Sequence, residues 1–215
     1  MIDIDLLIFD VDGTLIDSRK DIVKAVNHTL KRLGLKDKSF DEVVSYIGTG
    51  MRDLMRRSLG EGNLHLLEKG LDIFKDFYRV HSADETRPYP NVIETLEYFK
   101  DKTKAVVSNR DRQFAELTLR LLGLDKYFKR IVGGDDERCI KPMACPLDNI
   151  LKDFGTDKKK AVIIGDMDLD IISGKNAGVV TCGVTYGIGR PEDILKAEPD
   201  FVIDDMSELR GIVKK

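Results

Sequence analysis

The stretch Leu6-Leu7-Ile8-Phe9-Asp10-Val11-Asp12-Gly13-Thr14 joins a short apolar run to an acidic turn. The run Leu6–Phe9 is too short for a helix and too uniformly apolar for a sheet with one wet face, so it predicts a buried parallel strand. Ligands of open parallel sheets bind at the carboxyl ends of the strands. We therefore expect Asp10 and Asp12 to lie at a functional edge of a sheet.

Three further apolar runs have the same character and lie at Ala105–Val107, Ala161–Ile164 and Val179–Val184. Helical spacing of apolar residues after Pro90 and after Asp111 fills the gaps between them. Strands that alternate with helices predict an α/β fold with a doubly wound, mainly parallel sheet.

Residues 16–85 break this alternation, because they contain helical patterns and no strand-like run. Ser18 and Asp21 have the spacing of a capping box at the start of the first of these helices. We expect an all-helical domain at 16–85, inserted into a discontinuous α/β core domain that comprises 1–15 and 86–215.

Composition limits the classes of partner. The chain of 215 residues has 35 basic and 38 acidic side chains, for a formal charge of −3, so a polybasic nucleic-acid or membrane surface is not expected. No apolar run approaches the roughly 18 to 20 residues of a membrane span, and we expect a cytoplasmic protein, monomeric or homodimeric. The three cysteines, Cys139, Cys145 and Cys182, lack C-x-x-C spacing, which favours free thiols over a disulfide scaffold.

Polar residues end the predicted strands: Ser108-Asn109 follows the second, and Gly165-Asp166, with Asp170 beyond it, follows the third. Carboxylates gathered at one sheet edge repel one another unless a cation neutralises them. All-oxygen ligands without His or Cys suit Mg²⁺, which in turn favours a phosphate substrate. Lys141, next to Pro142, adds a positive charge. Taken singly, these residues are equally typical of turns, helix starts and surface lysines.

Together, the ordered motifs Asp10-Val11-Asp12-Gly13-Thr14, Ser108-Asn109, Lys141-Pro142 and Gly165-Asp166 resemble those of the haloacid dehalogenase-like hydrolase superfamily. The resemblance implies a Rossmann-like core and a small helical cap. It also implies a Mg²⁺-dependent phosphatase that acts on a small phosphorylated metabolite, most like phosphoglycolate phosphatase. Retention of the second aspartate, Asp12, points to a phosphatase or phosphomutase within the superfamily.

The resemblance also implies individual roles. Asp10 would form an aspartyl-phosphate, Asp12 would act as general acid and base, and Lys141 would offset charge at the phosphoryl group. The residues implied to hold Mg²⁺ are Asp10, Asp12 through its backbone carbonyl, Asp166 and Asp170. Those implied to bind substrate are Thr14, Ser108 and Asn109. Two positions depart from the pattern, namely Met167 in place of Ser or Thr and Arg110 in place of Lys.

The insertion contains Gly48-Thr49-Gly50-Met51-Arg52, a flexible turn entering a helix. By analogy with the cap, Arg52 is a candidate contact for a substrate carboxylate or second phosphate; an exposed arginine at a helix start is the simpler alternative. Three other functions stay open: a β-phosphoglucomutase-like phosphotransferase, a phospho-accepting module of the receiver type, and a non-catalytic binding protein.

Overall fold

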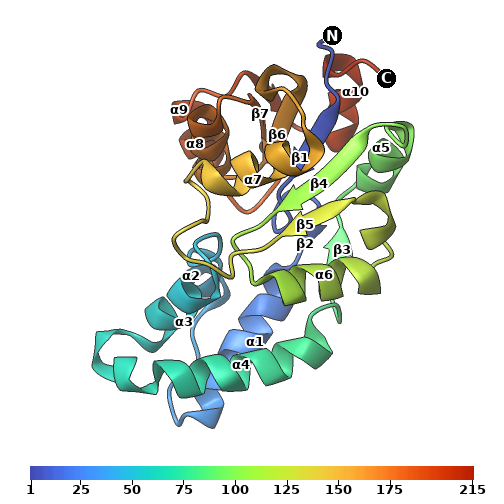
Figure 1. Ribbon diagram of the computed structural model, residues 1–215. Coiled ribbons are helices and arrows are strands. Elements are labelled where there is room, and N and C mark those ends of the chain that lie inside the picture. The colour runs from blue at the N-terminus through green and yellow to red at the C-terminus, as the bar shows by residue number, and fades with distance from the viewer.

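The computed structural model describes residues 1–215, and its central sheet has six strands, all parallel (Figure 1). In spatial order they are β5 (Arg130–Val132), β4 (Thr103–Val107), β1 (Leu6–Phe9), β6 (Ala161–Gly165), β7 (Val180–Val184) and β8 (Phe201–Ile203). From β1 the chain moves to one edge through β4 and β5, then to the other through β6, β7 and β8. The order reverses beside β1, which is where doubly wound sheets bind ligands.

Helices cover both faces of this sheet, so the predicted fold class is confirmed. On one face lie α5 (Val92–Tyr98), α6 (Arg112–Leu121) and α10 (Leu209–Ile212), and on the other α7 (Cys145–Phe154), α8 (Asp168–Ala177) and α9 (Pro191–Lys196). Leu7 and Phe9 of β1 pack in the apolar cluster of the first face, and Leu6 and Ile8 in that of the second. Because both faces of β1 are buried, its sequence is apolar at every position.

Apart from the two-residue strand at its start, the regular structure of the insertion is helical, and its helices lie apart from the sheet (Figure 1). Its helices are α1 (Arg19–Arg32), α2 (Phe40–Val44), α3 (Met51–Leu59) and α4 (Leu67–His81). A short antiparallel pair, β2 (Ile16–Asp17) with β3 (Arg87–Pro88), joins them to the sheet. We call α1–α4 the cap. They have their own apolar core, which Phe114 of α6 also enters. The expected domain boundaries stay a prediction.

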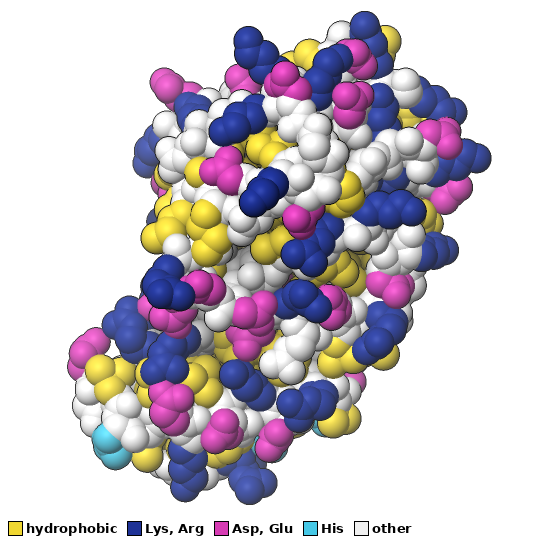
Figure 2. All heavy atoms as spheres, in the orientation of Figure 1, with side chains coloured by type: hydrophobic (Ala, Val, Ile, Leu, Met, Phe, Trp, Pro, Cys, Tyr) yellow, Lys and Arg dark blue, Asp and Glu magenta, His cyan; other side chains and the backbone are white.

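Short 3₁₀ helices complete the secondary structure at Glu61–Leu66, Asp125–Tyr127, Lys158–Lys160 and Met206–Glu208. No helix is both long and apolar enough to cross a membrane. On the face shown in Figure 2, basic and acidic side chains are interspersed rather than gathered by sign.

The capping box expected at α1 is wrong, although Ser18 does precede the helix. The Ser18 hydroxyl donates to Asp12, and Asp21 turns away to the end of the insertion. The Asp21 carboxylate is fully buried and accepts hydrogen bonds from the backbone N–H of Glu85 (2.9 Å) and of Thr86 (2.8 Å) and from the Thr86 hydroxyl (2.7 Å). These bonds fasten the start of α1 to the segment that returns to the core.

The expectation of three free thiols is also wrong. Cys139 and Cys145 form a disulfide with their Cα atoms 5.6 Å apart, while Cys182 is free and buried. The expectation rested on the missing C-x-x-C spacing. The connection between β5 and α7 folds back on itself, however, so that two cysteines six residues apart meet. Lys141 lies within the loop that this disulfide closes.

Candidate active site

Three acidic side chains converge at the carboxyl edge of the sheet. Asp10 follows β1, Asp166 follows β6, and Asp170 lies in the first turn of α8. All three are buried, and one carboxylate oxygen of each lies within 4.8 Å of those of the other two. The convergence follows from the topology, because β1 and β6 are hydrogen-bonded neighbours whose ends share one edge.

Asp166 is held rigidly. It accepts hydrogen bonds from the Thr14 hydroxyl (3.0 Å) and from the backbone N–H groups of Ile188 (2.8 Å) and Gly189 (2.9 Å). The acidic turn passes so close that a Cβ on Gly13, whose φ is +93°, would lie 2.1 Å from an Asp166 oxygen. Glycine is therefore required at position 13.

The sequence reasoning missed the loop that donates to Asp166. The loop is Gly187-Ile188-Gly189, and no motif in the sequence assigns it to the site. A Cβ on Gly187 would lie 2.4 Å from Cβ of Asp166, so the loop wraps the carboxylate at backbone distance. The two glycines were the available signal, but nothing in the sequence shows which side chain they approach.

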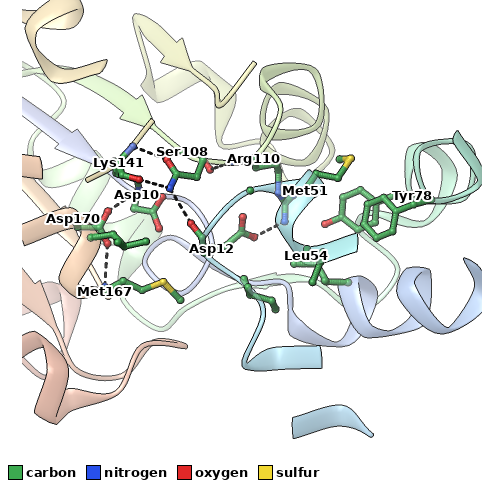
Figure 3. A pocket seen from close by; sticks show the side chains of 17 residues that line it. Asp10, Asp12, Met51, Leu54, Tyr78, Ser108, Arg110, Lys141, Met167 and Asp170 are labelled. Carbon is green, nitrogen blue, oxygen red and sulfur yellow. Dashed lines mark hydrogen bonds and ion pairs between the residues drawn. The ribbon is translucent and has the colours of Figure 1, made fainter. Parts of the chain in front are cut away.

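Lys141 bridges two side chains of the acidic cluster, Asp10 and Asp170. Its Nζ is 2.5 Å from Oδ1 of Asp10, 2.6 Å from Oδ1 of Asp170 and 3.1 Å from the Val107 carbonyl oxygen (Figure 3). Burial disfavours the charged ammonium, but the carboxylates of Asp10 and Asp170 outweigh it and raise the pKa of Lys141. The lysine therefore stays protonated and supplies one positive charge to the cluster.

One ammonium does not balance three buried carboxylates. Burial, reinforced by the negative charge of Asp170, raises the pKa of Asp166 to about 7. Burial raises the pKa of Asp10 well above its ordinary value, although the Lys141 charge acts against the shift. All the candidate metal ligands are oxygen atoms. The carbonyl oxygen of Asp12 accepts no backbone hydrogen bond, so it is free to be a further ligand. Excess negative charge and hard ligands fit a divalent cation such as Mg²⁺.

Asp12 points away from the acidic cluster, toward the cap. Its carboxylate accepts hydrogen bonds from the Ser18 hydroxyl and from Nη2 of Arg110 (Figure 3). Arg110 is itself buried, and its Nη1 donates to the Thr118 hydroxyl at 3.2 Å. Ser108 lines the same pocket, and its Oγ accepts the backbone N–H of Arg110 at 3.2 Å. Asp10 and Asp12 thus occupy different charge environments two residues apart.

Asn109 connects three parts of the site. Its side chain accepts the backbone N–H of Lys141 (2.8 Å) and donates to the Lys141 carbonyl (2.9 Å). It also donates to the carbonyl of Gly48 in the cap, at 2.9 Å. Asn109 therefore positions the lysine loop and joins the cap to the core.

One cavity faces most of these groups, although Asp166 is not among the residues that line it. The core contributes Asp10, Asp12, Ser108, Asn109, Arg110, Lys141, Met167, Leu169 and Asp170, and the cap contributes Ile22, Ile47, Gly48, Gly50, Met51, Leu54, Phe74 and Tyr78. The structure thus brings together most of the residues expected from the sequence. Met167, one of the departures from the expected pattern, lies in the cavity wall.

Thr14 and Arg52 lie elsewhere. The Thr14 hydroxyl is committed to Asp166 in a fully buried position, so it supports a candidate metal ligand instead of facing the cavity. The Arg52 side chain is about half exposed and outside the cavity; it donates to Glu68 and lies 3.8 Å from Glu137 of the core. The substrate contact expected for Arg52 stays untested.

The fold and the site define a Rossmann-like α/β enzyme with an acidic pocket suited to a metal ion. Residues 7–184 match the model of the haloacid dehalogenase-like hydrolase family. Phosphoglycolate phosphatase of Aquifex aeolicus is 37% identical over 213 residues, covering 93% of this chain and 99% of that protein. The enzyme of the same name from Agrobacterium fabrum is 35% identical, covering 95% and 90%. This chain belongs to the haloacid dehalogenase-like hydrolase family.

A solved structure agrees with this assignment. The crystal structure of a predicted phosphoglycolate phosphatase from Haemophilus somnus superposes with a TM-score of 0.91 at 30% identity. The superposition covers 99% of each chain, so it includes the cap as well as the sheet.

Proposed function

We propose that this protein is a Mg²⁺-dependent phosphatase that hydrolyses a small phosphorylated acid, phosphoglycolate, through an aspartyl-phosphate at Asp10. The observation that carries the proposal is one cavity lined by two of the three clustered carboxylates, by a lysine bonded to both of them, and by a further, separately bonded aspartate. The names of the relatives support the choice of substrate.

Asp10 would attack the phosphorus, so that a bond from its carboxylate to phosphorus forms as the ester bond to the leaving oxygen breaks. Lys141 and the Ser108 hydroxyl would bind the phosphoryl oxygens and offset their charge. Asp12, on the side of the cavity nearer the cap, would give its proton to the leaving oxygen. Asp12 would then take a proton from the water that attacks the aspartyl-phosphate, which releases inorganic phosphate and regenerates Asp10.

Asp10, Asp166 and the carbonyl of Asp12 would hold Mg²⁺, with Asp170 supporting the site. When bound, the ion would neutralise charge on the phosphoryl group and the carboxylates. Thr14 and the Gly187–Gly189 loop would keep Asp166 in place whether or not the ion is present.

The size of the cavity favours a small substrate over a sugar phosphate. Its volume is about 60 Å³, which at roughly 10–15 Å³ for each water-sized group suits a compact ester better than one that carries a hexose ring. A β-phosphoglucomutase-like enzyme must hold a hexose ring beside its phosphate. The cavity between cap and core therefore supports hydrolysis of a compact ester.

The test is phosphate release from a panel of phosphorylated metabolites, with Mg²⁺ and with EDTA. The panel would include phosphoglycolate, 3-phosphoglycerate and β-glucose 1-phosphate. We expect phosphoglycolate to have the highest kcat/KM and EDTA to abolish its turnover. A preference for β-glucose 1-phosphate that depends on added glucose 1,6-bisphosphate would instead identify a phosphotransferase. Absence of Mg²⁺-dependent phosphate release from every ester would overturn the proposal.

A further inference from the structure

The cap side of the cavity is apolar except for one hydroxyl. Met51 and Leu54 of α3 and Phe74 of α4 line it, and Tyr78 of α4 lies at its end (Figure 3). Tyr78 is 1% exposed, and its hydroxyl has no hydrogen-bond partner. A buried hydroxyl without a partner is unfavourable, so this group points to a ligand in the cavity.

Arg110 faces the Tyr78 ring from the core side. Its guanidinium carbon lies 5.1 Å from the ring centroid. The hydrogen bonds to Asp12 and Thr118 use two of the five N–H donors of the guanidinium, which leaves donors for a further acceptor. The planar fork of donors suits a carboxylate better than a hydroxyl or a carbonyl.

Charge balance points in the same direction. Asp12 is the only carboxylate bonded to Arg110. That carboxylate also accepts a hydrogen bond from the Ser18 hydroxyl, so buried Arg110 shares its one carboxylate partner with another donor. A buried guanidinium is strongly unfavourable unless it is paired and hydrogen-bonded. An anionic group on the substrate would bind the donors that Asp12 and Thr118 leave unused.

The contact between Arg110 and Asp12 also fixes where this anionic group must be. Asp12 would protonate the leaving oxygen, and Arg110 donates a hydrogen bond to Asp12. Arg110 therefore lies close to the leaving oxygen. A group that reaches both Arg110 and the Tyr78 hydroxyl must therefore be attached within one or two carbons of the leaving oxygen. The small volume of the cavity imposes the same limit.

We propose that Arg110 and Tyr78 form the subsite that binds the carboxylate of the substrate, so that the enzyme selects phosphorylated short-chain acids over neutral phosphate esters of equal size. This inference rests on the proposed function, whose substrate class it explains. It assigns carboxylate recognition to Arg110, the residue that departs from the expected lysine, and not to Arg52. Arg110 also positions Asp12, so its role must be separated from a general effect on the reaction.

Binding of two unreactive phosphonates separates carboxylate recognition by Arg110 from its effect on the reaction. In 3-phosphonopropionate a CH₂ group replaces the bridging oxygen of phosphoglycolate, and in propylphosphonate a methyl group also replaces the carboxylate. Calorimetry with the Mg²⁺-loaded protein gives Kd for both. We expect the carboxylate to tighten binding by about 50-fold or more. The Tyr78→Phe substitution should reduce this preference about fivefold, and Arg110→Gln should remove nearly all of it.

Arg110→Lys keeps the charge but loses the forked donors, so an intermediate preference is expected. Arg112→Gln removes a positive charge two residues away, outside the cavity, and should leave the preference as in the wild type. Equal binding of both phosphonates by the wild type would overturn the inference, and so would a preference of wild-type strength in folded Arg110→Gln and in Tyr78→Phe.

The experiment does not depend on turnover, so the two proposals fail separately. If phosphoglycolate is not hydrolysed but the carboxylate preference depends on Arg110 and Tyr78, the subsite stands and the proposed substrate is wrong. If phosphoglycolate is hydrolysed but the phosphonates bind equally well, the phosphatase stands and the subsite is refuted.

Discussion

The core wall and the cap wall of the cavity are built in opposite ways. On the core wall, Asp10, Lys141 and Asp170 are polar, buried and joined by hydrogen bonds. On the cap wall, Met51, Leu54 and Phe74 are apolar, and the one buried hydroxyl lacks a partner. The core wall is thus complete without substrate, and the cap wall is not.

This difference separates chemistry from selection. Groups that are already paired and rigid suit a reaction that is the same for every phosphate ester. An apolar wall with one or two donors suits discrimination among the groups attached to the phosphate. Substitutions on the core wall should therefore lower turnover of all esters, and substitutions on the cap wall should change which ester is preferred.

The largest effect is expected for Asp10→Asn, which removes the nucleophile while keeping the shape of the side chain. Turnover of p-nitrophenyl phosphate and of phosphoglycolate should fall by at least about 10⁴-fold, because no other group can form the acyl phosphate. Asp168→Asn is the control. Asp168 starts α8 but lies outside the acidic cluster, so the variant should stay active. Retained turnover in folded Asp10→Asn would show that the nucleophile is wrongly assigned.

The next largest effect is loss of the cation, and pH should control its binding. In the metal-free protein the pKa of Asp166 is about 7, against an ordinary value of 3.8. Below about pH 7 a proton competes with Mg²⁺, so affinity should rise by up to about tenfold per pH unit and level off above pH 7. EDTA should abolish turnover throughout. Calorimetric titration with Mg²⁺ between about pH 5.5 and 8 measures this dependence.

The stability of the metal-free protein should change with pH in the opposite direction to its Mg²⁺ affinity. Between about pH 4 and 7 folded metal-free protein holds a proton on Asp166 that the unfolded chain has lost, so its stability should fall as pH rises. Thermal unfolding in EDTA should show a lower Tm at about pH 7 than at about pH 5, with the largest rise on adding Mg²⁺ near pH 7. Asp166→Asn should weaken both trends; an unchanged pH dependence in that variant would place the titrating group elsewhere.

The sequence predicts the core wall far better than the cap wall. Strands β1, β4, β6 and β7 are almost wholly buried and mainly apolar, so their ends could be located and the polar residues that follow them assigned to one edge. Strands β5 and β8 were missed because each has three residues and includes an exposed one, Arg130 or Val202. Without those edges, the motifs at Asp10, Ser108 and Asp166 are still placed correctly, because each follows an inner strand. Lys141 lies in the connection after the missed strand β5, so its place relative to the sheet could not be predicted.

On the cap, Leu54 and Tyr78 belong to apolar helix stripes that look the same whether they face a core or a cavity. The sequence also could not show whether Arg52 or Arg110 is the better candidate for contact with the substrate. The pairing of Arg52 with Glu68, and the burial of Arg110 between Asp12 and Tyr78, exist only after the cap meets the core. These roles depend on contacts between cap and core, which the spacing of residues in the sequence does not reveal.

A smaller effect is expected where the two walls meet, at Asn109. Asn109→Ala removes two hydrogen bonds to the Lys141 backbone and one to Gly48, so the lysine loop loses its position. We expect kcat to fall by roughly 30- to 100-fold for every ester, because misplacing a catalytic group by about 1 Å costs about 10²-fold.

The cap provides a matched control for this variant. Asn27 makes the same pair of hydrogen bonds, to the N–H and carbonyl of Lys38 at 2.9 Å each, far from the acidic cluster. Asn27→Ala should therefore lose similar stability but keep kcat. Equal loss of kcat in both variants, measured at saturating substrate, would attribute the effect to weakened folding and not to the lysine loop.

The smallest effect tests selection by size on the cap wall. Leu54→Ala enlarges the cavity, so the preference for phosphoglycolate over 2-phospholactate, which carries one more methyl group, should fall by about tenfold in kcat/KM. Leu71→Ala is the control: both leucines are 6% exposed and belong to the same apolar cluster, but only Leu54 lines the cavity. Each variant should lose about 2–5 kcal/mol of unfolding free energy. If Leu71→Ala relaxes the preference equally, the cap selects through its overall rigidity and not through the wall that touches the substrate.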